Sequence, residues 1–271
     1  MALKAERVGE AKAGLDAIRL FALAVLAGAF IAFGAMFATV TVAGAADFLP
    51  FGVARLLSGL TFSLGLILVV IGGAELFTGN ALIVMAWAAR RVTTLALLRN
   101  WLIVLIGNLV GAVATAGLIF AAGQYGFGGG QVGAAALAAA EAKAELGFGE
   151  ALALGILCNV LVCLAVWLSF SARTVAGKVA AVVPPVAAFV AGGFEHSIAN
   201  MYFLPLGLMI KAGAGDGFWA DIAAQPENYD ALTVSGMILN LVPVIIGNII
   251  GGGVLVGAVY WFVYLRHRKI T

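Results

Sequence analysis

The sequence predicts an all-α membrane protein whose six transmembrane helices form two inverted three-span repeats, and three observations lead to this prediction. The chain is 63% hydrophobic and 10% charged, whereas soluble proteins carry roughly 25% charged residues. Apolar runs long enough to cross a bilayer recur along it. Related polar motifs interrupt the second and the fifth run. We expect one transmembrane channel domain over residues 1–271, with repeats at about 15–123 and 151–265.

Six apolar runs are long enough for transmembrane helices. The hydrocarbon core is about 30 Å thick and a helix rises about 1.5 Å per residue, so about 20 residues suffice. The runs cover residues 20–46, 56–89, 101–122, 151–172, 179–210 and 232–265. The second and fifth exceed one straight span and have a polar motif near the middle. We expect a broken helix in each, with a loop at membrane depth that lines a cavity or is buried in protein.

The interrupting motifs share Gly, Glu and Asn at identical spacing. They are Gly73-Ala-Glu75-Leu-Phe-Thr78-Gly-Asn80 and Gly193-Phe-Glu195-His196-Ser-Ile-Ala-Asn200. A second pair recurs in the third and sixth runs, as Gly107-Asn108-Leu-Val-Gly111 and Gly247-Asn248-Ile-Ile-Gly251. An odd number of spans per half gives the halves opposite orientations. This organisation is typical of channels and transporters built from inverted repeats.

The basic residues predict the orientation, because cytoplasmic segments of membrane proteins are enriched in Lys and Arg. With the N-terminus inside, the cytoplasmic segments contain Lys4, Arg7, Lys12, Arg19, Arg90, Arg91, Arg99, Arg173, Lys178, Arg266, Arg268 and Lys269. The other side contains Arg55, Lys143 and Lys211. We expect both termini to be cytoplasmic and residues 126–150 to form an external loop with a short helix. Residues 1–19 are a candidate cytoplasmic helix able to gate the pore by pH.

Three ionisable side chains, Tyr and Cys aside, fall in the middle of the runs: Glu75, Glu195 and His196. An ionisable residue inside a membrane is a candidate functional group. The matched glutamates favour a structural role, in which each accepts N–H bonds from the broken backbone. His196 has no counterpart, since Leu76 stands at its place, and an imidazole can exchange a proton near neutral pH. Together with the Thr78 hydroxyl, His196 can bind one small solute. Because the N-termini of broken helices attract negative charge, this solute is expected to be an anion.

Other functional classes have weaker support. The net charge of +2 gives no reason to expect a nucleic-acid partner. No P-loop, dinucleotide fingerprint or metal-ligand motif indicates an enzyme or a cofactor. Cys158 and Cys163 are expected to be small packing residues in an apolar run. A neutral-solute pore of the aquaporin type stays an alternative, although its paired Asn-Pro-Ala motifs do not occur here.

The chain resembles the formate/nitrite transporter family. The stretch Glu75-Leu-Phe-Thr78 is similar to the family's first-break motif, and Gly193-Phe-Glu195-His196-Ser-Ile-Ala-Asn200-Met is similar to its second-break motif. Asn240-Leu-Val-Pro243 through Gly247-Asn248-Ile-Ile-Gly251-Gly resembles the sixth-span signature. The resemblance covers about residues 15–265, and the second half is especially similar to bacterial formate channels. It implies an aquaporin-like fold, a homopentamer with one pore per subunit, and passage of formate across the bacterial inner membrane, with nitrite or hydrosulfide as the alternative.

The resemblance also implies roles for individual residues. His196 would be the central pore histidine, and Thr78 would be the hydroxyl of the opposite loop. Glu195 and Asn200 would orient His196 or hold the broken helix, and Asn159 would line the vestibule.

Further implied positions lie along the pathway on either side of this centre. Lys143 matches an external lysine that draws in anions, with a solvated surface lysine as the alternative interpretation. Two apolar slits would be formed by Phe62, Leu66, Leu76, Phe77, Val162 and Phe189.

Overall fold

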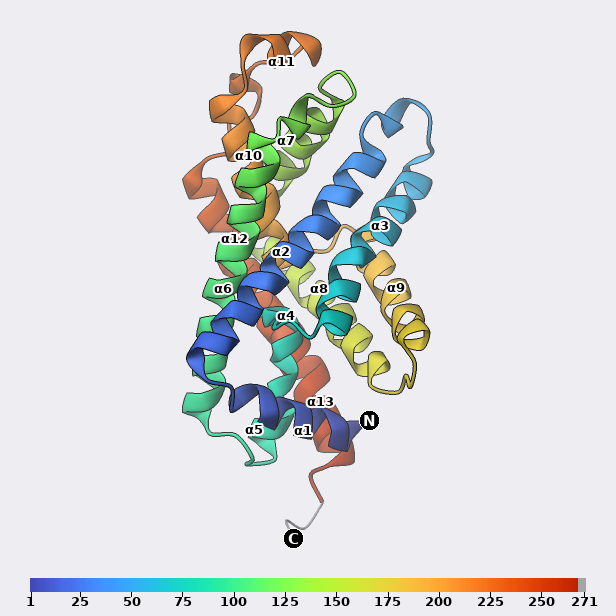
Figure 1. The fold of residues 1–271 in the computed structure, drawn as a ribbon, viewed down its shortest axis with the longest axis vertical. Helices are drawn as coiled ribbons and strands as arrows, with labels where there is room; N and C mark the ends of the chain where they lie inside the picture. The colour runs from blue at the N-terminus through green and yellow to red at the C-terminus, as the bar shows by residue number, and fades with distance from the viewer. Residues whose placement is uncertain (268–271) are drawn as a thin grey trace.

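The computed structural model describes residues 1–267, and every regular element among them is helical (Figure 1). In chain order these are α1 (Ala2–Ala13), α2 (Ala17–Val42), η1 (Ala45–Asp47), α3 (Phe51–Gly72), α4 (Phe77–Asn80), η2 (Ala81–Ile83), α5 (Val84–Ala88), α6 (Thr94–Ala121), η3 (Gln124–Gly126), α7 (Gln131–Ala144), α8 (Phe148–Ser169), α9 (Val175–Ala191), α10 (Ser197–Gly213), α11 (Asp216–Asp221), η4 (Pro226–Asn228), α12 (Val234–Asn248), η5 (Ile249–Ala258) and α13 (Val259–Tyr264). Arg268 and Lys269, counted above among the cytoplasmic basic residues, lie outside the described residues.

The helices overlap the apolar runs, but several begin earlier than hydropathy alone predicts. α6 begins at Thr94 because the Thr93 side chain accepts a hydrogen bond from the Ala96 N–H. α9 begins at Val175, where the Thr174 hydroxyl accepts from the Gly177 N–H. Such caps satisfy the first free N–H groups of a helix and so fix its start. Hydropathy indicates the apolar stretch, whereas the N-terminal cap determines where the helix begins.

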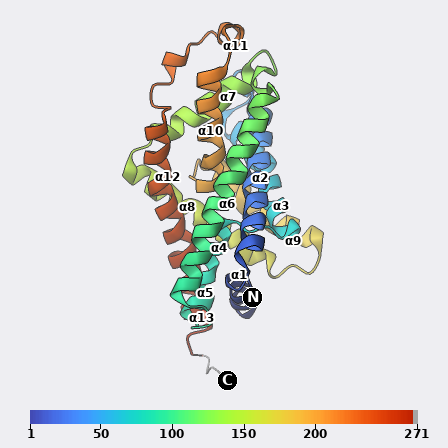
Figure 2. The same cartoon turned by 60° about the vertical axis from the view of Figure 1, so that its left-hand side comes forward.

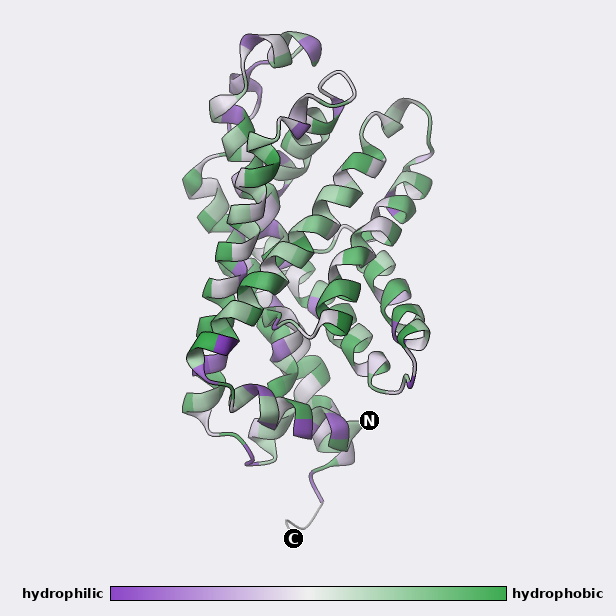
Figure 3. Cartoon of the chain, viewed as in Figure 1, coloured by the Kyte–Doolittle hydropathy of each residue, from purple (hydrophilic) through white to green (hydrophobic). Residues whose placement is uncertain are grey.

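Among residues 1–267, five helical segments are long and apolar enough to cross a membrane. They are Ala17–Val42, Phe51–Gly72, Thr94–Ala121, Phe148–Ser169 and Val234–Tyr264. The fifth apolar run is divided between α9 and α10, which have 17 residues each. Figure 3 shows apolar residues along most of the long helices and hydrophilic residues on α1 and α11, at opposite ends of the molecule.

Both predicted helix breaks are confirmed. α3 ends at Gly72 and α4 begins at Phe77, while α9 ends at Ala191 and α10 begins at Ser197. Gly73 and Gly193 have φ angles of 74° and 72°. Glycine adopts this left-handed conformation without the steric cost that a Cβ atom brings. The matched glycines therefore turn the chain out of each half-helix in the same way.

The helices of the two halves pack in corresponding pairs. α2 lies against α3 and α6, and α8 lies against α9 and α12, as the views in Figures 1 and 2 agree. A Cβ atom on Gly111 would clash with the carbonyl oxygen of Val25, and one on Gly251 would clash with that of Ile156. The second motif pair thus allows close helix crossings, which stabilise helix bundles in lipid.

The molecule has two distinct ends (Figure 1). α1, α5 and α13 lie together at one end, and α7 and α11 lie at the other. Between them, the sixth apolar run departs from a plain α-helix, because residues 249–258 form the π-helix η5. Hydropathy does not predict this π-helix, and π-helical turns are often found at functional sites.

Candidate functional site: a buried contact between two helix breaks

The two helix breaks meet at one side-chain contact. Thr78 Oγ1 lies 3.0 Å from His196 Nε2, and the two residues are 0% and 3% exposed. His196 also caps α10, where its Nδ1 accepts from the Ala199 N–H at 3.1 Å. A neutral imidazole whose Nδ1 accepts has its hydrogen on Nε2. His196 therefore donates to Thr78 in its neutral form, and the threonine hydroxyl hydrogen is available to a further acceptor.

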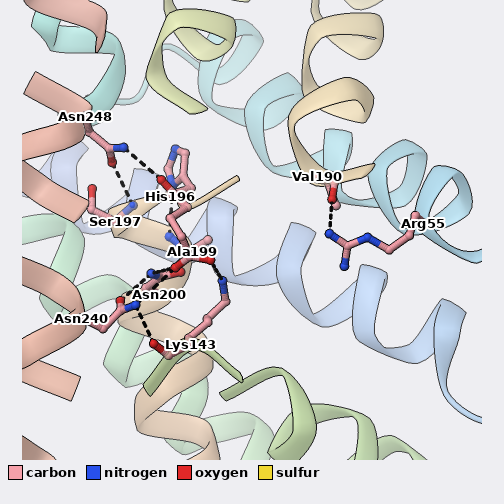
Figure 4. Close-up of polar contacts among 10 residues, drawn as sticks. Arg55, Lys143, Val190, His196, Ser197, Ala199, Asn200, Asn240 and Asn248 are labelled. Carbon is pink, nitrogen blue, oxygen red and sulfur yellow. Dashed lines mark hydrogen bonds and ion pairs between the residues drawn. The ribbon is translucent and has the colours of Figure 1, made fainter. Parts of the chain in front are cut away.

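Two asparagines hold the broken backbone. Asn108 Oδ1 accepts from the Phe77 N–H, and its Nδ2 donates to the carbonyls of Ala24 and Glu75. In the other half, Asn248 Oδ1 accepts from the Ser197 N–H (Figure 4), and its Nδ2 donates to the carbonyls of Gly155 and Glu195. The bonds correspond one to one. An amide with one acceptor and two donors is suited to backbone groups that a helix break leaves unpaired.

The Glu195 side chain belongs to a network of polar groups beside the break. Its Oε1 accepts from Lys143 Nζ at 2.6 Å and its Oε2 accepts from Asn200 Nδ2 at 2.6 Å. Asn200 Nδ2 also donates to Asn240 Oδ1 at 2.7 Å, and Asn240 Nδ2 donates to the Lys143 carbonyl at 2.8 Å (Figure 4). The carboxylate is thereby paired with a cation and hydrogen-bonded, which buried charges require.

The same network recurs around Glu75. Its two oxygens accept from Lys12 Nζ at 2.9 Å and from Asn80 Nδ2 at 2.7 Å. Asn80 Nδ2 donates to Asn100 Oδ1, and Asn100 Nδ2 donates to the Lys12 carbonyl. The lysine here comes from the N-terminal helix α1, which is therefore tied to the first break.

The glutamates thus have other partners than expected. Both accept from lysine and asparagine side chains. The N–H groups of Phe77 and Ser197 donate to Asn108 and Asn248 instead. Those of Glu75 and Glu195 donate to the backbone carbonyls of Leu23 and Leu154. Within residues 1–267, the Glu195 and Asn200 side chains bond to each other, to Lys143 and to Asn240, and not to His196.

Two cavities approach the Thr78–His196 contact from opposite ends. The α7-side cavity, of about 490 Å³, is lined by His196, Glu195, Asn200 and Lys143 among others. The α1-side cavity, of about 200 Å³, is lined by Glu75 and Asn80, and by residues of α1 that include Lys12. Each cavity therefore has one of the lysine–glutamate pairs in its wall.

Four of the six candidate slit residues line these cavities. Phe62 and Phe189 line the α7-side cavity with ring centroids 5.7 Å apart, and the Phe189 ring stacks on His196 at 5.9 Å. Leu66 and Leu76 line the α1-side cavity. Phe77 packs edge-on against Trp101, and Val162 is buried in the main core. Apolar side chains thus flank the contact on both sides.

Two further candidates, Asn159 and Lys143, bond to neighbouring parts of the chain. Asn159 is fully buried, and its Nδ2 donates to the carbonyls of Thr78 and Asn248, so it joins the first break to α12. The Lys143 side chain is 17% exposed and paired with Glu195, which excludes the solvated surface lysine.

Sequence reasoning missed several members of this site. Lys12 was counted only as a cytoplasmic charge, and Asn100 went unnoticed. A signal for Asn100 was present, because Asn100 and Asn240 have the same separation in sequence as Asn108 and Asn248. No comparable signal exists for Lys12, whose place depends on how α1 docks.

The described residues, 1–267, contain no group of three His, Cys, Asp or Glu side chains able to hold a metal ion. What the geometry offers instead is a pair of cavities, a buried imidazole–hydroxyl contact between them and a cation in each wall. Such an arrangement can bind a small anion and exchange a proton with it.

The chain is similar to known membrane channels along nearly its whole length. A family model described as formate/nitrite transporter matches residues 1–262. The formate channel FocA of Escherichia coli K12 is 48% identical over 269 residues, which cover 99% of this chain and 94% of that protein. The formate channel FocA of Haemophilus influenzae is 40% identical, covering 97% and 93%.

Solved structures agree with the sequence relatives. A structure described as a pentameric formate channel with formate bound matches with a TM-score of 0.87 and 47% identity, over 92% of this chain and 98% of that one. A second, described as an FNT family ion channel, matches with a TM-score of 0.80 and 28% identity, covering 97% and 98%. The chain belongs to the formate/nitrite transporter family.

Proposed function

We propose that this chain is a channel that conducts formate across the bacterial inner membrane. The observation that carries the proposal is the buried Thr78–His196 contact, which lies between two cavities and joins the two helix breaks. The relatives at 48% and 40% identity are named formate channels. These features support a channel rather than an enzyme.

The proposed architecture has six spans in two inverted repeats and five subunits, each with its own pore. The one-to-one bonds of Asn108 and Asn248, and the two lysine–glutamate–asparagine networks, support an inverted repeat. The pentamer rests on the similar structure, which is described as pentameric. The excess of basic residues at the end with α1 and α13 supports cytoplasmic termini.

In the proposed mechanism, formate enters one cavity and loses its water between apolar side chains. It then accepts hydrogen bonds from His196 Nε2–H and from the Thr78 hydroxyl. Protonation of His196 on Nδ1, which releases the Ala199 N–H, gives an imidazolium. The imidazolium can give its Nε2 proton to formate, which leaves neutral imidazole and formic acid. The neutral acid passes an apolar slit at a much smaller desolvation cost than the anion. His196 thereby either hydrogen-bonds or protonates the substrate.

The test is uptake of labelled formate into proteoliposomes over a range of pH. We expect uptake by the wild type to rise on acidification, His196→Ala to lose this response, and Thr78→Ala to lose part of the flux. Thr115→Val serves as the control, because within residues 1–267 the Thr115 hydroxyl bonds only to the Gly111 carbonyl of its own helix. Size-exclusion profiles establish that each variant assembles.

Each other result has a defined meaning. An unchanged pH profile in His196→Ala would contradict the proton-donor role. Flux of nitrite or hydrosulfide without formate flux would move the assignment to the alternative anion. Flux of glycerol or water that is the same in the wild type and in His196→Ala would favour a neutral-solute pore.

A further inference from the structure

Arg55 occupies an unusual place at the α7-side cavity. Its Nη2 donates to the Val190 carbonyl at 2.8 Å and its Nε donates to the Ala191 carbonyl at 3.2 Å. These are the last residues of the half-helix α9. The guanidinium also lies 5.9 Å from the centre of the exposed Phe51 ring. Arg55 therefore caps the end of a half-helix with a full positive charge.

The helix packing explains how Arg55 reaches this end. One turn further along α3, Gly59 lies so close to α9 that a Cβ atom would be within 2.8 Å of Ala187 Cα. Residues four apart lie on the same face of a helix, so Arg55 also faces α9. Because the two helices run in opposite directions, Arg55 meets α9 three residues beyond Ala187.

The end of α9 is unfavourable for an anion. The last carbonyls of a helix have no partners within it and give its C-terminus about half a negative charge. Val190 and Gly192 of this terminus line the same cavity as His196. An anion that enters the cavity would meet these carbonyls if no cation covered them.

Other basic residues at this end have different partners. Lys143 is paired with Glu195, and Lys211 Nζ donates to the carbonyls of Tyr229 and Leu232. Within residues 1–267, the ion pairs do not include Arg55. Figure 4 shows Arg55 well apart from Lys143, so cations stand on two separated parts of the cavity wall.

The opposite cavity lacks this arrangement. The end of α3 lines the α1-side cavity with Val69, Val70 and Gly73, and the described lining of that cavity contains no arginine. Since Arg55 has no counterpart there, its influence is confined to one mouth of the pathway.

We propose that Arg55 is a selectivity-determining residue, which offsets the negative end of α9 and favours entry of anions from the α7 side. This inference rests on the proposed anion-channel function. Arg55 acts on the anion through charge, so it is separate from the hydrogen bonds of His196 and Thr78.

The test is formate flux through Arg55→Met, Arg55→Lys and wild type in oriented planar bilayers, at low and high ionic strength. At low salt, we expect formate flux entering from the α7 side to be about three- to tenfold lower in Arg55→Met than in the wild type. Flux entering from the α1 side falls less. Arg55→Lys retains most of the wild-type flux. High salt reduces the difference in flux between Arg55→Met and the wild type, because dissolved ions screen the charge. Arg99→Met is the matched control, because Arg99 donates to the Leu15 carbonyl outside the lining of both cavities.

A second variant tests the charge of the same cavity wall in a protein that keeps Arg55, so it does not depend on the assembly of Arg55→Met. Glu150 is an exposed acid that lines the same cavity in the first turn of α8. Glu150→Gln removes a negative charge, so it should raise entry from the α7 side and partly restore flux to Arg55→Met.

The outcomes separate the two proposals. If the wild type conducts formate but Arg55→Met and Glu150→Gln leave flux from the α7 side unchanged, the role of Arg55 is wrong while the channel stands. If Arg55→Lys is as poor as Arg55→Met, the guanidinium shape rather than its charge matters, which also overturns the inference. If the wild type conducts no formate or other anion, the proposed function itself fails.

Discussion

At the residue scale, the glutamates were expected to bond the broken backbone, but asparagines perform this task and the glutamates bind lysines instead. Asparagines 108 and 248 satisfy the backbone of the breaks, and the glutamates 75 and 195 accept from lysines. The chemistry favours this division, because an amide offers donors and an acceptor whereas a carboxylate offers only acceptors. At each break the asparagine bonds one backbone N–H and one backbone carbonyl, which a carboxylate cannot do. The carboxylate then remains available to hold a cation in a cavity wall.

Replacing Asn108 with Ala should destabilise the protein strongly. The change leaves the Phe77 N–H and the carbonyls of Ala24 and Glu75 without their partner. Buried polar groups without partners cost about 1–3 kcal/mol each, so we expect a loss of about 2–4 kcal/mol. Thermal unfolding in detergent measures it. Thr115→Val on the same helix should change stability little, and equal effects of the two variants would contradict the anchoring role.

At the scale of the element, the π-helix η5 positions the first break. A Cβ atom on Gly252 would clash with Asn159 Nδ2 and lie 2.6 Å from Cys163 Sγ. Both side chains bond to the Thr78 carbonyl. Asn159 Nδ2 also donates to the Asn248 carbonyl at 2.6 Å, directly before η5. The wide π turn and the missing side chain at Gly252 thus leave room for the groups that hold Thr78.

Gly252→Ala should therefore reduce formate flux through displacement of Thr78. The added methyl group pushes Asn159 and Cys163 away from the Thr78 carbonyl, so we expect a loss of several-fold in flux together with a lower unfolding temperature. Gly253→Ala is the matched control, because the nearest atom to its Cβ is Val84 Cγ2 at 3.4 Å. Proteoliposome uptake by the two variants makes the comparison. A Gly252→Ala protein as active as Gly253→Ala would show that η5 does not position the loop.

Elements also differ in how far the sequence predicts them. The helix breaks were predictable, because a Gly and a Glu within a long apolar run disagree with a continuous span. The π-helix was not, since residues 249–258 are as apolar as an ordinary helix and a widened turn leaves no trace in hydropathy. The packing of α1 against the first helix break could not be predicted either. Its contact with Glu75 depends on Lys12 meeting a residue 63 positions away in the sequence.

At the scale of the whole molecule, the two halves place equivalent networks at opposite ends of one pathway. Lys143 with Glu195 lies in the wall of the α7-side cavity, and Lys12 with Glu75 lies in that of the α1-side cavity. The equivalence is broken at the centre, where His196 meets Thr78. It is also broken at the ends, where α1 supplies one lysine and α7 the other. An anion therefore meets similar chemistry from either side but a single central imidazole.

The orientation of the molecule can be tested with single cysteines. Native Cys158 and Cys163 are free and buried, so the wild type should react little with a membrane-impermeant maleimide. Asp216 begins α11 and Glu10 lies on α1, and both side chains are exposed. Because basic residues gather at the α1 end, we expect Asp216→Cys to be labelled on intact spheroplasts. Glu10→Cys should be labelled only after the membrane is permeabilised. The reverse pattern would place both termini outside and make the α1-side cavity the external mouth, whereas labelling of both positions on intact cells would contradict a single orientation.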